Sequence, residues 1–310
     1  MEAIIIEGLV KSYGPNVAVD HANLHIDEGT VFGLIGPNGA GKTTILRSLL
    51  GIIPYDSGKV LVSGTDMRRA NPQLKLKIGY LPQRAAFQEW KTTEQVLLSL
   101  GRLSGLEKTY LKERVDEVLE LLGIEEYRSR KVGKLSGGTM QKLGFAQAIL
   151  HEPSVLILDE PMAALDPSSR FLFKKIIKES RALGTTILFS SHILSDIEDL
   201  ADSVGLLQQG KVRYSGTIAG LKKEVDLRSE LMVEVVDDKG EWASVRLPGV
   251  DIRQPSPGYL VVHLSDVTQW DVMVPKIMEA LMNAGCHIRS FNRREPNLED
   301  VYMAYVGGSN

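Results

Sequence analysis

The sequence predicts an α/β fold, a mixed β-sheet with helices, built around one glycine-rich loop. Residues 36–44 read Gly-Pro-Asn-Gly-Ala-Gly-Lys-Thr-Thr and match the pattern G-x-x-x-x-G-K-[ST]. The apolar run 31–35 just before the loop predicts a buried strand. Apolar residues just after it recur at helical spacing: Ile45, Leu46, Leu49 and Leu50. A loop of this composition between a strand and a helix is typical of a phosphate-binding site.

The residue types of this loop suit a phosphate chain. Glycines let several backbone N–H groups converge on it, and the helix beginning near Lys42 adds its partial positive charge. We expect Lys42 to reach the β- and γ-phosphates and the Thr43 hydroxyl to hold Mg²⁺. A glycine turn with an accidental lysine is the alternative. The candidate nucleotide contacts are Gly36, Pro37, Asn38, Gly39, Ala40, Gly41, Lys42, Thr43 and Thr44.

Bulk properties exclude several other classes of protein. The 310 residues suffice for about two domains of ~150 residues. The net charge of −3 gives no indication of a nucleic-acid partner. The single cysteine, Cys286, excludes an internal disulfide and fits a reducing cytosol. No apolar run approaches the ~20 residues of a membrane helix, and the first residues lack the basic region of a signal peptide. We therefore expect any membrane role to come through a partner.

Polar side chains follow three predicted strands. The apolar run 155–158 ends in Asp159 and Glu160, the run 185–191 leads to His192, and Gln83 follows the strand predicted at 77–81. If these strands are parallel, all four side chains meet at one edge of the sheet. We expect Asp159 to pair with Mg²⁺ and Glu160 to orient water. The alternative is that these side chains have no role in a site: Asp159 and Glu160 would be solvated acids, Gln83 a surface amide and His192 an ordinary histidine.

Two further features are weaker when taken alone. Tyr13 is an aromatic residue that stacks on a base or simply packs. Ser136, Gly137 and Gly138 are predicted to form a turn at the start of a helix. This turn is either a second anion-binding site or an ordinary turn.

The remaining pattern outlines the other elements. Short strands are predicted at 3–6, 23–26 and 58–63, and helical character from 92 to about 122, with a capping box between Thr92 and Gln95. The basic run 128–134 reads as a solvated loop. After residue 222 the chain becomes a β-rich α+β unit with no catalytic constellation and, at Cys286 and His287, no metal site. Its expected strands are 231–236, 244–247, 259–264 and 288–291, and its expected helices are 272–284 and 298–305.

Taken in order, these features resemble the ATP-binding subunits of ABC transporters over residues 1–222. Residues 36–44 are similar to the Walker A motif, 135–138 to the LSGGQ signature, 155–160 to Walker B and 163–166 to the D-loop. Gln83, His192 and Tyr13 resemble the Q-loop glutamine, the switch histidine and the adenine-stacking aromatic. The implied fold is a P-loop NTPase of ABC type. It has a mixed sheet core, a helical subdomain at about 85–150 and an antiparallel β subdomain, followed by an accessory α+β domain at 223–310.

The resemblance implies a mechanism with ATP and Mg²⁺ as cofactors. Two such domains would close head to tail, with Ser136, Gly137 and Gly138 touching the γ-phosphate on the opposite subunit. Lys42, Glu160 and His192 would be catalytic, and Thr43, Gln83 and Asp159 would hold the metal. The implied partners are a transmembrane permease and a second ATP-binding subunit, with no nucleic acid. The chain would then be cytoplasmic and peripheral on the inner face of the cell membrane.

The family pattern is not followed everywhere. Thr139 stands where the signature usually has Gln, and Met162 and Ala163 cannot donate hydroxyl hydrogen bonds at the seam. Residues 296–302 resemble the C-terminal extension of drug-exporting groups, which favours export. A soluble ABC-type ATPase switch that acts on nucleic acid or ribosomes is the alternative, and a P-loop kinase is a third. The transported substrate stays open, because the membrane subunit usually sets it.

Overall fold

The computed structural model describes residues 1–69, 72–163, 165–224, 230–236, 240–264, 270–294 and 296–307. The chain forms two compact units, Met1–Ile218 and Ala219–Asn310. Within the described ranges, no helix combines the length and the apolar character needed to cross a membrane.

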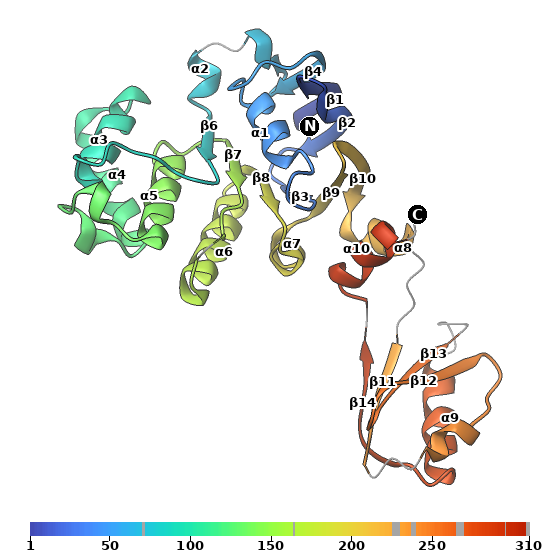
Figure 1. Cartoon of the computed structure of the whole chain (residues 1–310). Helices are drawn as coiled ribbons and strands as arrows, with labels where there is room; N and C mark the ends of the chain where they lie inside the picture. Colours follow the sequence, from blue (N-terminus) through green and yellow to red (C-terminus); the bar gives the residue numbers. More distant parts are fainter. Residues whose placement is uncertain are drawn as a thin grey trace. The chain divides into compact units, whose positions relative to one another are not determined.

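A six-stranded mixed sheet forms the centre of the first unit, in the order β10-β9-β3-β8-β7-β6 (Figure 1). Its five strands from β9 to β6 run parallel, and β10 is antiparallel at the edge. Every residue of β3, β7 and β8 is buried, as continuous apolar runs predict for parallel strands covered on both faces. The bounds are β3 Val31–Ile35, β6 Ile78–Leu81, β7 Val155–Asp159, β8 Thr186–Ser191, β9 Ser203–Gln208 and β10 Lys211–Thr217.

A four-stranded antiparallel sheet, β2-β1-β4-β5, forms a second layer of this unit. Its strands are β1 Glu2–Tyr13, β2 Asn16–Asp27, β4 Ser57–Val62 and β5 Thr65–Asp66. The short strands expected at 3–6 and 23–26 are therefore only parts of a long hairpin, in which Leu9, Val19 and Ala22 are buried as well. Beyond Leu9 the pairing continues through two register shifts to Tyr13 and Asn16, so the backbone ladder persists where the regular apolar alternation does not.

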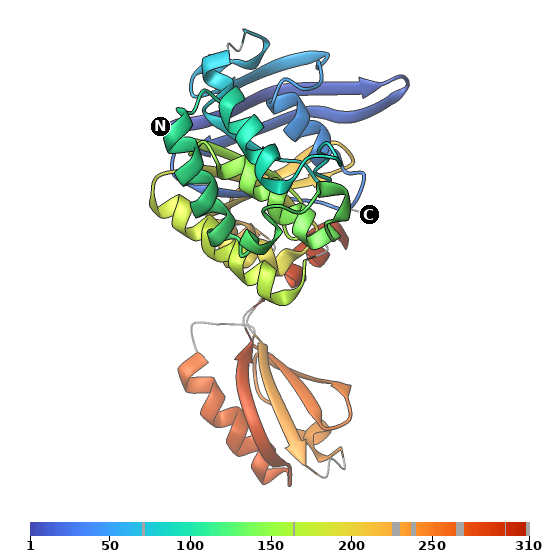
Figure 2. The same cartoon turned by 90° about the vertical axis from the view of Figure 1, so that its left-hand side faces the viewer.

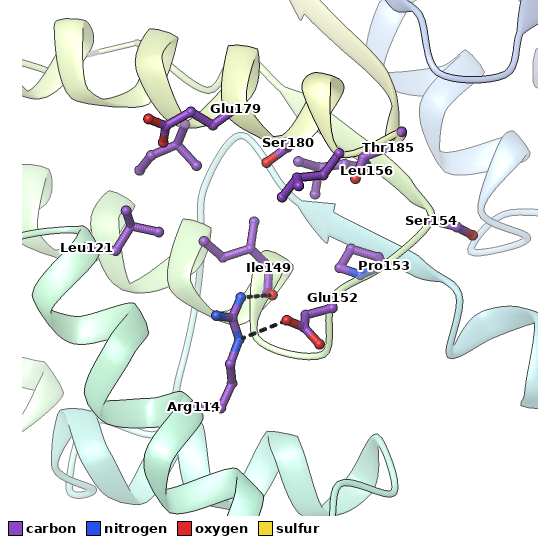
Figure 3. A pocket seen from close by; sticks show the side chains of 13 residues that line it. Arg114, Leu121, Ile149, Glu152, Pro153, Ser154, Leu156, Glu179, Ser180 and Thr185 are labelled. Carbon is purple, nitrogen blue, oxygen red and sulfur yellow. Dashed lines mark hydrogen bonds and ion pairs between the residues drawn. The ribbon is translucent and has the colours of Figure 1, made fainter.

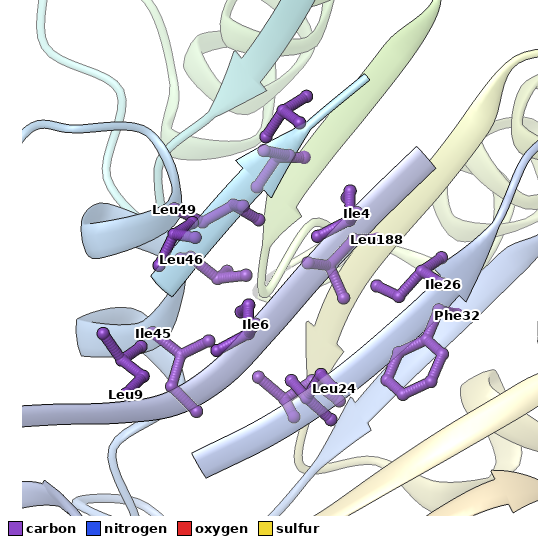
Figure 4. Packing of buried hydrophobic residues seen from close by; sticks show 14 of the residues in the cluster. Ile4, Ile6, Leu9, Leu24, Ile26, Phe32, Ile45, Leu46, Leu49 and Leu188 are labelled. Atoms are coloured by element: carbon purple, nitrogen blue, oxygen red, sulfur yellow. The ribbon is translucent and has the colours of Figure 1, made fainter. Parts of the chain in front are cut away.

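Helix α1, Lys42–Leu49, lies between the two sheets and closes the main core (Figure 4). Ile45, Leu46 and Leu49 face the apolar side chains of both sheets and are fully buried. Gly51 ends the helix in the left-handed region with φ 64°. The helix that follows the glycine-rich loop is thus anchored on its apolar stripe, which holds its N-terminus at the sheet edge.

Three helices cluster at one side of this unit (Figures 1 and 2): α3 Thr93–Leu103, α4 Lys108–Leu121 and α5 Gly137–Ile149. The predicted capping box is present, since Thr92 Oγ1 accepts from Gln95 N and Gln95 Oε1 accepts from Thr92 N. The rings of Phe145 and Phe173 stack 4.4 Å apart and join α5 to α6, Pro167–Ala182. Helices α6 and α7, Leu194–Leu200, pack on the mixed sheet. Helix α2, Pro72–Lys75, is a single short turn, and α8, Ile218–Glu224, begins at the last residue of this unit.

The second unit contains a four-stranded antiparallel sheet in the order β12-β13-β11-β14, with α9 against one face. Its core includes Val233, Val262, Ile277 and Leu281, all fully buried. The bounds are β11 Glu230–Val236, β12 Val250–Ser256, β13 Tyr259–Leu264, β14 His287–Arg294, α9 Trp270–Asn283 and α10 Leu298–Gly307.

The prediction of a strand at 244–247 is wrong. Glu241–Ser244 forms a short 3₁₀ helix, and Val245 and Leu247 pack against the core from a loop. The actual strand, β12, exposes alternate residues such as Asp251 and Arg253, so it lacks an apolar run. A reciprocal cap begins the last helix, because Asn297 Oδ1 accepts from Asp300 N and Asp300 Oδ2 accepts from Asn297 N.

Candidate active site

The glycine-rich loop leaves β3 at the carboxyl edge of the parallel strands and turns directly into α1. Gly41 has φ 109°, and a Cβ there would lie 2.4 Å from the carbonyl oxygen of Ala18. A Cβ at Gly36 would lie 2.5 Å from the carbonyl oxygen of Leu207. Both positions therefore exclude a side chain, which explains why the turn needs glycine.

Gly41 occupies the N-cap of α1 and contributes no side-chain cap. The first N–H groups of a helix have no partner within it, so here they stay available for an anion. A cavity of about 260 Å³ opens at this point, and it is lined by residues 37–44 together with Ala18, Gln83 and Glu160. This arrangement has the backbone dipoles, the lysine and the shape to hold a phosphate chain.

The side chain of Lys42 is buried and turns back over the loop. Its Nζ donates to the carbonyl oxygens of Gly36 at 2.6 Å and Pro37 at 3.3 Å. Nζ also lies 3.4 Å from Glu160 Oε1, with both side chains about 5% exposed. The lysine charge thus sits inside the loop, within reach of any anion bound there.

Glu160 follows β7 and has φ 52°, a left-handed conformation that is uncommon for a non-glycine residue and persists only where the surrounding structure holds it. Its Oε2 lies 2.8 Å from His192 Nδ1, while Oε1 faces Lys42. His192 follows β8, and its ring is partly exposed. The parallel strands therefore do bring Glu160, His192 and the glycine-rich loop together at one edge, as the sequence predicts.

Asp159 is the last residue of β7 and is completely buried. Its Oδ1 accepts a hydrogen bond from Ser190 Oγ at 2.7 Å, whereas Oδ2 finds no hydrogen-bond partner among the described residues. Burial, helped by the Asp159 charge, raises the pKa of the Tyr80 phenol. A buried carboxylate oxygen without a partner is costly unless a cation or donor meets it, and Mg²⁺ prefers oxygen ligands. Asp159 thus fits the metal role expected of it.

Other expected site residues lie elsewhere. Tyr13 is half exposed, with Lys11 Nζ 5.1 Å from its ring centre, and it is not among the described residues that line the cavity. The turn Ser136-Gly137-Gly138 likewise contributes nothing to that lining. Ser136 caps α5 instead, and its Oγ lies 2.8 Å from Thr139 Oγ1. In the expected D-loop, Ala164 lies outside the described residues.

Two buried polar residues join the site without having been expected there. Ser190 contacts both acidic residues, since its Oγ also accepts from Glu160 N at 2.9 Å. Gln141 of α5 donates to the carbonyl oxygen of Pro161 at 3.2 Å. The only signal for Ser190 is a polar residue inside an apolar strand that leads to His192.

A larger cleft of about 530 Å³ lies away from this site (Figure 3). Its lining includes Ser154 and Thr185, which precede β7 and β8, so it is at the amino edge of the sheet. Arg114 lies on one side of it, with contacts to the Ile149 carbonyl oxygen and to Glu152, while Glu179 and Ser180 of α6 lie on the other side. The phosphate-binding features all gather at the opposite edge.

This fold and this site define a nucleotide-binding protein with a phosphate-binding loop. Comparison with known proteins shows to which family of such proteins the chain belongs. The family model described as "ABC transporter" matches residues 19–163. The ABC transporter ATP-binding protein YxlF of Bacillus subtilis is 36% identical over 97% of this chain and 98% of its own. The bacitracin transport ATP-binding protein BcrA of Bacillus licheniformis is 32% identical, over 97% and 96%.

A solved ATP-binding subunit of an ABC transporter superposes with a TM-score of 0.68 at 27% identity, covering 72% of this chain and 92% of that one. The chain belongs to the family of ABC transporter ATP-binding proteins, and its first unit has the ABC ATPase fold.

Proposed function

We propose that the chain hydrolyses Mg²⁺-ATP and thereby energises a separate membrane-spanning transporter. The observation that carries this proposal is the position of the Glu160 carboxylate, held between Lys42 and His192 at the mouth of the phosphate-binding loop. A carboxylate placed there is able to polarise a water molecule for attack on a terminal phosphate.

The chain's own groups would act as follows. The loop N–H groups bind the phosphate chain, and Lys42 exchanges its carbonyl contacts for phosphate oxygens. Thr43, Gln83 and Asp159 would hold Mg²⁺, which neutralises phosphate charge when bound. Glu160 would orient water, while His192, which contacts Glu160 through Nδ1, would hold that carboxylate and bind the γ-phosphate. The buried position of Lys42 and Glu160 strengthens these interactions by excluding water.

A second ATP-binding subunit would complete the site. The turn at Ser136–Gly138 caps a 13-residue helix, is exposed on its own subunit and does not line the cavity there, as far as the described residues go. Its N–H groups are thus available to a γ-phosphate held by another subunit, in a head-to-tail pair. Hydrolysis would remove this contact and reopen the pair.

A membrane-spanning partner fits an apolar groove that begins three residues after Gln83. The groove, of about 640 Å³, is lined by residues 86–91 together with Val96, Ser99, Leu100 and Leu103. Trp90 is 69% exposed and Leu103 80% exposed, and because both line the same groove they form a contiguous apolar patch rather than isolated surface residues. We assign this groove to a cytoplasmic segment of the transporter, because relatives of this length are ATP-binding proteins of transporters.

A photo-crosslinking experiment tests this assignment. A photoreactive residue at Trp90, in the full chain within its native membranes, should crosslink to a protein with several membrane spans. The same residue at Phe171, which is 72% exposed on α6 outside the groove, is the matched control. Crosslinks from Trp90 to ribosomal or other soluble proteins alone would favour the alternative, an ABC-type ATPase switch that is not tied to transport.

Export of an antibiotic or related compound is the direction we favour. The support is the similarity to BcrA, named for bacitracin transport, together with the C-terminal extension. For the accessory domain at 223–310 we propose a role in regulation or in subunit contact. Deleting these residues should change ATP-dependent pairing or transport-coupled activity. If pairing, partner binding and coupled activity all stayed the same, the accessory role would be wrong.

A further inference from the structure

Ser190 is a completely buried hydroxyl residue that directly follows the apolar run of β8. The three residues before it on β8 are Ile187, Leu188 and Phe189, and none of the four is exposed. Ser190 pairs in register with Leu34 of β3 on one side and with Asp159 of β7 on the other. A hydroxyl at such a place is destabilising unless both its donor and its acceptor capacity are used.

The Ser190 hydroxyl donates one hydrogen bond and accepts another, and both partners belong to the candidate active site. Ser190 Oγ lies 2.9 Å from the backbone N of Glu160 and 2.7 Å from Asp159 Oδ1. A backbone N–H only donates, so Oγ accepts from Glu160, and its single proton is left for the Asp159 carboxylate. The direction of both hydrogen bonds therefore follows without ambiguity.

The first bond holds the turn at Glu160. Pairing between β7 and β8 ends at Asp159 and Ser190, so the sheet ladder supplies Glu160 with no further partner. The Ser190 hydroxyl accepts the Glu160 N–H in place of a strand carbonyl. This supports the left-handed backbone, φ 52°, that directs the Glu160 carboxylate toward Lys42 and His192.

The second bond fixes the orientation of the Asp159 carboxylate. With Oδ1 held by Ser190, Oδ2 is the oxygen left buried and without a partner among the described residues. One hydroxyl thus sets both the oxygen offered to a cation and the residue that orients water.

We infer that Ser190 is a positioning residue of the metal–nucleotide site, acting through Asp159 and Glu160 rather than touching substrate. The inference rests on the proposed function, in which Asp159 faces Mg²⁺. Outer-shell partners of this kind typically change metal affinity or activity by about 10- to 100-fold when removed.

The test compares three variants of the full chain. Ser190→Ala removes the hydroxyl, and Ser190→Thr restores it on a slightly larger side chain. Thr186→Val is the matched control, because Thr186 is a buried hydroxyl residue at the other end of β8 whose Oγ1 accepts from Gly29 N at 3.0 Å. This variant also loses a hydrogen bond from a backbone N–H to a buried hydroxyl residue, but at the end of the strand away from the acidic residues.

Three quantities are measured: the Kd for ATP with EDTA, the Kd for ATP with excess Mg²⁺, and kcat. In Ser190→Ala we expect the Kd for ATP in EDTA to equal that of the wild type. The tightening of ATP binding by Mg²⁺, which we call the Mg²⁺ gain, should be smaller than in the wild type by up to about tenfold, and kcat should be lower by about 10- to 100-fold. Ser190→Thr should recover most of both losses. Thr186→Val should lose thermal stability while keeping the Mg²⁺ gain and kcat.

Ser190→Ala with the wild-type Mg²⁺ gain and kcat would overturn the inference, as would equal losses in Thr186→Val. If Ser190→Ala does not fold, Ser190→Cys carries the same prediction, because a thiol nearly keeps the shape but bonds weakly. A wild-type chain that binds ATP no better with Mg²⁺ than with EDTA would instead contradict the proposed function itself.

Discussion

Nδ1 of His192 lies 2.8 Å from Oε2 of Glu160, although the two residues are 32 positions apart in the sequence. The contact exists because β7 and β8 are parallel neighbours and each strand delivers its next polar residues to the same edge. With Lys42 on the other carboxylate oxygen, the Glu160 side chain links the lysine of the phosphate-binding loop to the imidazole that follows β8.

Replacing His192 with alanine should slow hydrolysis while leaving ATP binding intact. The Glu160 carboxylate would lose the partner on Oε2 and turn toward Lys42 or solvent. We expect kcat to fall about 10²-fold, the range typical of a positioned acid–base group. Because both residues act on the same step, the double variant with Glu160→Gln should be no slower than the slower single variant. Multiplied losses in steady-state kinetics would show that the two residues act independently.

Replacing Lys42 with alanine should weaken nucleotide binding itself. The ammonium group is buried within the loop, and losing a charge-assisted hydrogen bond costs about 1.5–3 kcal/mol, or roughly 10- to 100-fold in Kd. Titration with a fluorescent ATP analogue measures the affinity. The matched control is Lys59→Ala, since Lys59 is exposed and pairs with Glu7 on the antiparallel sheet. Equal affinities for the wild type and Lys42→Ala would remove the role assigned to this lysine.

The stability of the chain should fall as the pH drops below about 6.5, in part because of His151. Burial lowers the pKa of this imidazole from its usual value of 6.5, while the Ile78 carbonyl oxygen accepts from its neutral ring at 3.3 Å. Below pH 6.5 the unfolded chain takes up a proton that the folded chain resists, so the free energy of unfolding decreases with falling pH.

Urea unfolding at pH 7.5 and pH 5.5 measures this effect. In His151→Gln the loss of stability between the two values should be smaller than in the wild type. An identical loss in both proteins would mean that other groups account for the dependence.

The phosphate-binding loop, the capping box at Thr92 and the strand that ends in Asp159 could be predicted because their chemistry admits few residue types. Backbone N–H groups approach a phosphate only where glycine leaves room, as at Gly36 and Gly41. Their local sequence therefore carries the full signal, and the fold class follows from it.

Elements that depend on distant partners could not be predicted in the same way. The long hairpin of β1 and β2 extends well past the predicted strands at 3–6 and 23–26, because backbone pairing continues through register shifts that break the regular alternation of apolar residues. Strands β9 and β10 are not among the elements expected from the sequence. Ser190 gains its importance only when β8 is placed beside β7, which no local pattern around it reveals.

The central claim is that two copies of this chain hold Mg²⁺-ATP between them and that Glu160 triggers its hydrolysis. Light scattering of purified Glu160→Gln, with and without saturating Mg²⁺-ATP, tests it directly when phosphate release is followed in the same sample. We predict a dimer that appears only with nucleotide and a hydrolysis rate about 10²-fold or more below the wild type. A protein that stays monomeric in saturating Mg²⁺-ATP, or that hydrolyses it at the wild-type rate, would contradict the account.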